Sequence, residues 1–294
     1  MKLIEKIYPI LLSPAKKTFI EIVFFRLAIA FFILDSLLIA LVYLGVVPAS
    51  IYCHRGMPNP LSIIYTPFSI LLLYEVYLLI FFLPHSITTY LGKQYEIITL
   101  ILVRKLFYDI PQLLTPEAYN EKNILHLLVS LGGLIALCGL IFCFYRLAQN
   151  REKHSFSYSN AIYERFVARK KALSIVLVLI FFFLFIKSFW ELSKLHISTV
   201  DDVALGIRQM SNTFFNDFFV VLILIEVLLL LFTFSFSDKF SKVVRNSGFI
   251  ISTMLLKLSF RAEENTTVFI MLIATVFGVA ILWRYRLFGK KIDK

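Results

Sequence analysis

The sequence reads Tyr74-Glu75-Val76-Tyr77-Leu78-Leu79-Ile80-Phe81 in one apolar segment and Ile225-Glu226-Val227-Leu228-Leu229-Leu230-Leu231-Phe232 in another, 151 residues later. Each stretch places one carboxylate inside an apolar run. A carboxylate inside a membrane span is costly and marks a candidate functional site. Two of them at matching places predict an internal repeat, with a site built where the two halves meet.

The composition is typical of an integral membrane protein. The 294 residues are 59% hydrophobic, with a mean hydropathy of +0.82. Only 17% are charged, against about 25% in soluble domains. We interpret the net charge of +11 as positive-inside loops that contact anionic headgroups, and not as nucleic-acid binding. The three cysteines do not form a disulfide framework, because Cys138 and Cys143 fall inside one apolar segment.

Six segments are long and apolar enough to cross about 30 Å of hydrocarbon: residues 18–46, 61–84, 123–146, 172–193, 213–236 and 266–288. Two shorter segments, 91–104 and 245–257, contain glycine and end in a basic residue. They could span the membrane, lie at its interface or re-enter. The charges favour spanning, because eight spans leave 20 Lys and Arg in the inner segments and eight in the outer ones. With six spans, the basic segment 146–171 would lie outside.

The sequence therefore predicts an all-α polytopic protein of the cytoplasmic (inner) membrane, with about eight transmembrane helices and both termini cytoplasmic. Residues 1–148 are expected to form a first four-helix repeat, 149–171 a basic cytoplasmic linker, and 172–294 a second four-helix repeat. Because four spans per half is an even number, the repeats should be parallel and related by an axis near the membrane normal. The alternative is that Leu- and Phe-rich helices align with one another without being repeats.

Four charged residues inside the predicted spans are the candidate ion-path or gating residues: Asp35, Glu75, Lys187 and Glu226. Asp35 and Lys187 occupy matching positions in the first helix of each half. They could meet near the repeat axis, either as a gate or as a static pair that docks the halves. Glu75 and Glu226 could relay protons or coordinate cations, or serve only as hydrogen-bonding glue between helices.

The two short segments are a further pointer, because interrupted hydrophobic stretches at corresponding places often mark a transport site. Their polar side chains could line a hydrated path, or could be small residues that allow close helix packing: Glu96, Thr99, Asn246, Ser247, Ser252 and Thr253. Three histidines predicted near the outer face could hold a metal or haem, although no two share a helix at ligand spacing: His54, His126 and His196.

The sequence contains no HExxH, GxSxG or P-loop motif, so neither an enzyme nor a cofactor is expected. The leading hypothesis is a membrane ion pathway, a channel or transporter for protons or small cations. The alternative is a non-conducting membrane-embedded subunit of a larger complex, and the third is a membrane enzyme or redox subunit. The expected partners are the lipid bilayer and either a second copy or other membrane subunits, with no nucleic acid.

Overall fold

The structure, a computed structural model, describes residues 2–48, 63–113, 121–149, 160–194, 200–236, 240–260 and 264–292. Within these ranges all regular structure is helical, which confirms the all-α part of the predicted fold class. The helices are α1 (Lys2–Leu11), α2 (Pro14–Tyr43), α4 (Tyr65–Phe82), α5 (Ile87–Leu113), α6 (Glu121–Gln149), α7 (Asn160–Ser193), α8 (Val200–Phe236), α9 (Phe240–Ser259) and α10 (Glu264–Ile292).

Local signals explain where α2 begins and ends. The Ser13 side chain accepts a hydrogen bond of 3.2 Å from the backbone N–H of Lys16, and Pro14 occupies the first turn, where its missing N–H costs nothing. At the other end Gly45 adopts a φ of 73°, a left-handed conformation that only glycine reaches without strain. These two features give α2 its 30 residues, about 45 Å of helix.

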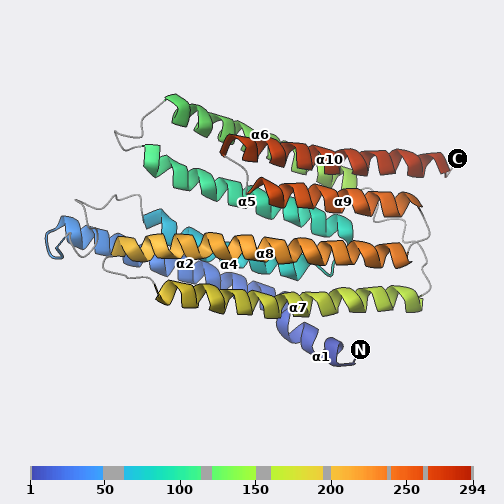
Figure 1. Ribbon diagram of the computed structural model, residues 1–294, viewed down its shortest axis with the longest axis horizontal. Coiled ribbons are helices and arrows are strands. Elements are labelled where there is room, and N and C mark those ends of the chain that lie inside the picture. The colour runs from blue at the N-terminus through green and yellow to red at the C-terminus, as the bar shows by residue number, and fades with distance from the viewer. Residues whose placement is uncertain are drawn as a thin grey trace.

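The long helices form one bundle in which consecutive helices run in alternating directions (Figure 1). Along the chain α2 packs on α4, α4 on α5 and α5 on α6, and likewise α7 packs on α8, α8 on α9 and α9 on α10. The two series meet through α4 with α8, α5 with α9, and α6 with α10. Both chain termini lie at the same end of the bundle (Figure 1). Lys16 and Lys17 in the first turn of α2, and Arg284 and Arg286 in the last turns of α10, therefore lie toward this end. We call this end the basic end.

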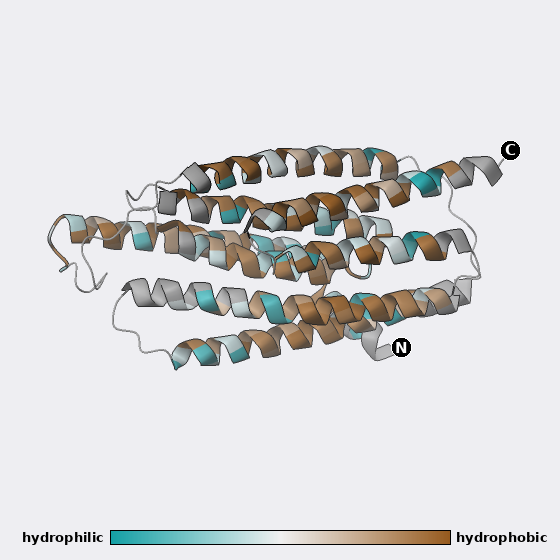
Figure 2. Cartoon of the chain, turned by 45° about the horizontal axis from the view of Figure 1, so that its top comes forward, coloured by the Kyte–Doolittle hydropathy of each residue, from teal (hydrophilic) through white to brown (hydrophobic). Residues whose placement is uncertain are grey.

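Five helical segments of the described chain are long and apolar enough to cross a membrane: Tyr8–Tyr43, Asn123–Gln149, Val167–Ser193, Thr213–Phe234 and Thr266–Leu287. Thr66–Phe82 is a shorter apolar helix. Figure 2 shows that apolar residues run along most of the bundle length. Many large apolar side chains are exposed, among them Ile135, Phe183 and Trp190, as expected of a surface that lipid covers. The protein is therefore a helical membrane protein.

The two segments left open by the sequence are uninterrupted helices. Residues 91–104 belong to the 27-residue α5, and residues 245–257 to the 20-residue α9. Both lie inside the bundle, because α5 contacts α4, α6 and α9, while α9 contacts α8 and α10. The segment expected as a linker, 149–171, is partly helical, since α7 begins at Asn160.

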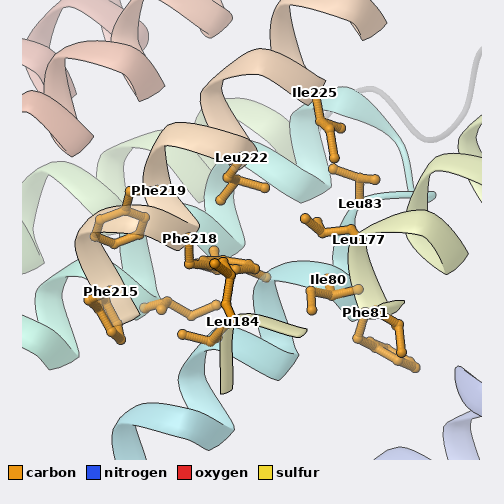
Figure 3. Packing of buried hydrophobic residues seen from close by; sticks show 14 of the residues in the cluster. Ile80, Phe81, Leu83, Leu177, Leu184, Phe215, Phe218, Phe219, Leu222 and Ile225 are labelled. Carbon is orange, nitrogen blue, oxygen red and sulfur yellow. The ribbon is translucent and has the colours of Figure 1, made fainter. Parts of the chain in front are cut away.

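Buried apolar residues form two main clusters. The first joins α4, α5, α7 and α8, and Figure 3 shows its aromatic centre at Phe215, Phe218 and Phe219, with Ile80 and Leu177 beside them. The second joins α5, α6, α9 and α10. The polar side chains described next lie between these clusters, on the helices where the two series of helices meet.

Candidate functional site

The carboxylate of Glu226 is the centre of a buried polar network from three helices. Its Oε1 atom accepts hydrogen bonds from the Tyr90 hydroxyl, at 2.9 Å, and from the Gln94 amide, at 2.5 Å. Its Oε2 atom accepts one from the Thr253 hydroxyl, at 2.9 Å, and lies 2.5 Å from the ammonium nitrogen of Lys257. Glu226 is on α8, Tyr90 and Gln94 are on α5, and Thr253 and Lys257 are on α9.

All five groups are withdrawn from solvent and lipid. Glu226 is 1% exposed, Gln94 is fully buried and Lys257 is 3% exposed. Each carboxylate oxygen has two neighbouring donors, so the acceptor sites of the carboxylate are well occupied. These contacts offset part of the cost of burying the polar side chain of Glu226.

Two polar atoms of this network keep unused hydrogen-bonding capacity within the described part of the chain. The Gln94 amide oxygen accepts no hydrogen bond there, and the Lys257 ammonium approaches Glu226 without hydrogen-bond geometry. The contact between Lys257 and Glu226 is therefore an ion pair without a hydrogen bond. Buried groups with unused capacity are uncommon in native proteins, and each one needs a physical explanation.

Hydrogen bonds from the first turn of α5 to Ser86 fix the position of Tyr90. The Ser86 hydroxyl accepts a hydrogen bond of 3.1 Å from the backbone N–H of Thr89, and the Ser86 carbonyl accepts one of 2.8 Å from the N–H of Tyr90. Ser86 thus caps the helix and satisfies N–H groups that would otherwise lack partners. Tyr90 is consequently fixed in the first turn of α5, with its hydroxyl at Glu226.

The other predicted carboxylate, Glu75, has a similar but sparser environment. Its Oε2 atom lies 3.9 Å from the Arg104 guanidinium, and both side chains are largely buried, at 10% and 13% exposure. The guanidinium also lies over the Phe215 ring of α8, 5.6 Å from its centroid. Arg104 therefore contacts both series of helices.

A second polar contact joins α5 to α9 and α10. The Tyr95 and Ser252 hydroxyls are 2.7 Å apart, and Ser252 donates a hydrogen bond of 2.6 Å to the carbonyl of Ala274. A Cβ atom at Gly278 would overlap the Tyr95 hydroxyl, so glycine there leaves room for the contact. Small residues commonly permit such close approach between membrane helices.

Asp35 and Lys187 do not pair with each other. Lys187 forms an ion pair of 3.0 Å with Asp217 of α8, and both side chains are nearly half exposed. Asp35 instead accepts a hydrogen bond from the Thr66 side chain. The reason is that α2 packs on α4 and α7 on α8, which places the first helix of each half beside its own second helix.

Of the six predicted lining residues, Thr253 alone contacts Glu226. Ser252 joins the neighbouring Tyr95 contact. The remaining four have contacts within their own helices, and Glu96 in addition interacts with the Tyr145 hydroxyl of α6. Thr99 and Ser247 donate to the carbonyls of Tyr95 and Val243 one helical turn earlier. Asn246 accepts from the adjacent Arg245, and Glu96 pairs with Lys93 at 2.6 Å.

No three His, Cys, Asp or Glu side chains gather at metal-binding distance in the described part of the chain. His126 is half-buried on α6, while His54 and His196 lie outside the described residues.

Sequence reasoning missed the basic partners of both glutamates. Arg104 and Lys257 are the basic residues that end the two short segments, and the eight-span prediction places both among the eight outer charges; in the structure both are buried. The signal was present, because they are 153 residues apart, the same spacing that relates Thr99 to Ser252.

Comparison of the chain with protein-family models, with curated proteins and with solved structures finds no match.

Proposed function

We propose that this protein is a membrane ion pathway for protons or small cations, with the Glu226 network as its polar centre and with this structure as a closed state. The observation that carries the proposal is the burial of Glu226 and Lys257, with Tyr90, Gln94 and Thr253 around the carboxylate. Ionisable groups inside membrane bundles are costly and characteristically mark ion and proton routes.

A purely structural role accounts less well for these residues. A buried ion pair contributes little net stability compared with packed apolar side chains, because desolvation offsets the Coulomb attraction. Neutral hydrogen bonds would join the helices at lower cost. The unused capacity of Gln94 and Lys257 beside an ionisable carboxylate suits a group that exchanges protons or cations.

The proposal includes eight spans arranged as two parallel four-helix repeats, in the cytoplasmic membrane and with both termini cytoplasmic. Matching ion pairs support the repeat, because Glu75 pairs with Arg104 on the next helix and Glu226 pairs with Lys257 on the next helix. The contacts of α4 with α8, α5 with α9 and α6 with α10 each join helices that the repeat makes equivalent, in the same order along both halves. The Glu226 network, which takes residues from both repeats, would then lie at their interface.

The function is tested by proton and potassium flux through purified protein in liposomes. We expect wild-type flux, and we expect Glu226→Gln to lower it by roughly a hundredfold, the scale on which a positioned proton-transfer group acts. Glu75→Gln tests the second carboxylate. Glu191→Gln is the matched control, because it makes the same substitution at an exposed carboxylate on α7.

The flux assay has two decisive negative outcomes. Flux that is equal in wild type and Glu226→Gln would remove this network from the pathway. Absence of flux from folded wild-type protein, tried with both ions and both signs of the membrane potential, would favour a non-conducting subunit of a larger complex.

The number of spans is tested by cysteine labelling in spheroplasts with a membrane-impermeant maleimide, after replacement of Cys53, Cys138 and Cys143 by serine. Gln149→Cys, at the exposed end of α6, should stay unlabelled until the membrane is permeabilised. Val46→Cys should label at once. Val46 follows the C-terminal end of α2 and is 68% exposed. If α5 and α9 did not cross, the position of Gln149 would be external and would label like that of Val46.

A further inference from the structure

A groove of about 500 Å³ lies between α6 and α10, away from the Glu226 network. Its deeper wall is apolar and includes Leu140, Val276 and Val279. Its other end is lined by Arg146, Arg286 and the half-exposed Trp283. Arg146 lies in the last turn of α6, so the charged end of the groove faces the basic end of the bundle.

The groove has the length of one membrane leaflet. From Val276 to Arg286 there are ten helical steps, about 15 Å of rise and half of the roughly 30 Å hydrocarbon core. A tryptophan beside arginines at one end is typical of the boundary between hydrocarbon and headgroups. The apolar part therefore spans acyl-chain depth, and the arginines lie at phosphate depth.

The charge at the mouth of the groove is uncompensated in the described part of the chain. No acidic side chain there forms an ion pair with Arg146 or Arg286. The two guanidinium groups come from different helices and line one groove. Guanidinium groups bind phosphate oxygens through paired N–H donors. A helix from a partner protein would match this charge only if it carried acidic side chains of its own.

We propose that this groove binds an anionic phospholipid of the cytoplasmic leaflet, with its phosphate held by Arg146 and Arg286 and one acyl chain lying along Leu140, Val276 and Val279. Basic recesses between membrane helices on the cytoplasmic side are suited to anionic headgroups. The inference is independent of ion flux, because none of these residues belongs to the Glu226 network.

The test uses tryptophan fluorescence, because Trp283 lines the groove and the chain has only one other tryptophan, Trp190. In a Trp190→Phe background, the protein is placed in vesicles with brominated phosphatidylglycerol or brominated phosphatidylcholine at equal mole fraction. Each arginine near a membrane surface should favour the anionic lipid about fivefold. We therefore expect clearly stronger quenching of Trp283 by phosphatidylglycerol.

Three variants, each in the same background, separate the causes. Arg146→Gln/Arg286→Gln should reduce the preference to about one. Arg284→Gln should retain the preference, since Arg284 lies on the same turn of α10 but does not line the groove. Val276→Phe should weaken quenching by both lipids without altering charge, because it fills the acyl-chain portion. Size-exclusion profiles establish that each variant is folded.

Equal quenching of Trp283 by the two lipids in the starting protein would overturn the proposal. A preference that survives Arg146→Gln/Arg286→Gln would also overturn it, because other residues would then hold the headgroup. Inorganic phosphate is added as a competitor. Competition by phosphate together with unchanged quenching in Val276→Phe would identify a free-phosphate site, and would again contradict a lipid site.

Discussion

Replacement of Lys257 by alanine is expected to lower the free energy of unfolding by about 3 to 5 kcal/mol, the usual cost of leaving one charge of a buried ion pair without its partner. The ammonium lies 2.5 Å from Glu226 and the Lys257 side chain is buried, so water does not replace it. The Glu226 carboxylate would keep its three hydrogen-bond donors but lose its only cation in the described network. Reversible unfolding in mixed micelles measures the change.

The physical cause is tested by removing the second charge as well. Lys257→Met/Glu226→Gln leaves no buried charge at this place, while the Gln carbonyl can still accept from Tyr90 and Gln94. We expect this double variant to recover most of the stability lost in Lys257→Ala. Lys187→Ala is the control, because Lys187 belongs to a half-exposed ion pair and its loss should change stability far less. If Lys257→Ala and Lys187→Ala lowered the free energy of unfolding equally, burial would not be the reason that the Lys257 pair matters for stability.

Replacement of Phe218 by alanine is expected to lower the free energy of unfolding by about 2 to 4 kcal/mol. Phe218 is fully buried in the first apolar cluster (Figure 3). Its ring centroid lies 6.2 Å from that of Phe214 and 6.4 Å from that of Phe181. A soluble core would lose about 3 to 5 kcal/mol. The expected loss is smaller here because lipid tails solvate an apolar side chain as well as the core does, so lost packing is the main cost.

The matched control is Phe234→Ala, the same substitution on the same helix at a residue that is 50% exposed. This side chain contacts lipid on one face, and we expect a loss of less than about 1 kcal/mol because lipid fills the space that it leaves. The same unfolding measurement in mixed micelles compares the two variants. A loss in Phe218→Ala no larger than that in Phe234→Ala would contradict the tight packing between α7 and α8.

The sequence by itself determined that the chain is helical and belongs in a membrane. Runs of Leu, Ile and Phe longer than the hydrocarbon thickness can satisfy their backbone only as helices, so this conclusion needs no tertiary contact. The matching placement of Glu75 and Glu226 was also readable, and both carboxylates are buried as expected. These properties depend on local composition and on the bilayer as solvent.

The tertiary structure decided that α5 and α9 are uninterrupted helices inside the bundle, and it decided which basic side chains pair with the two glutamates. A hydropathy score measures how favourably a segment would lie in lipid, so it underestimates a helix that other helices surround. The neighbours of α5 and α9 are other helices, and these accommodate polar residues such as Gln94, Tyr95 and Thr253. Lys257 was therefore expected at the outer surface and is found beside Glu226. Lys187 was expected near Asp35 and is found beside Asp217. Partners of a buried charge depend on which helices are adjacent and at what height, and packing of the whole bundle sets both.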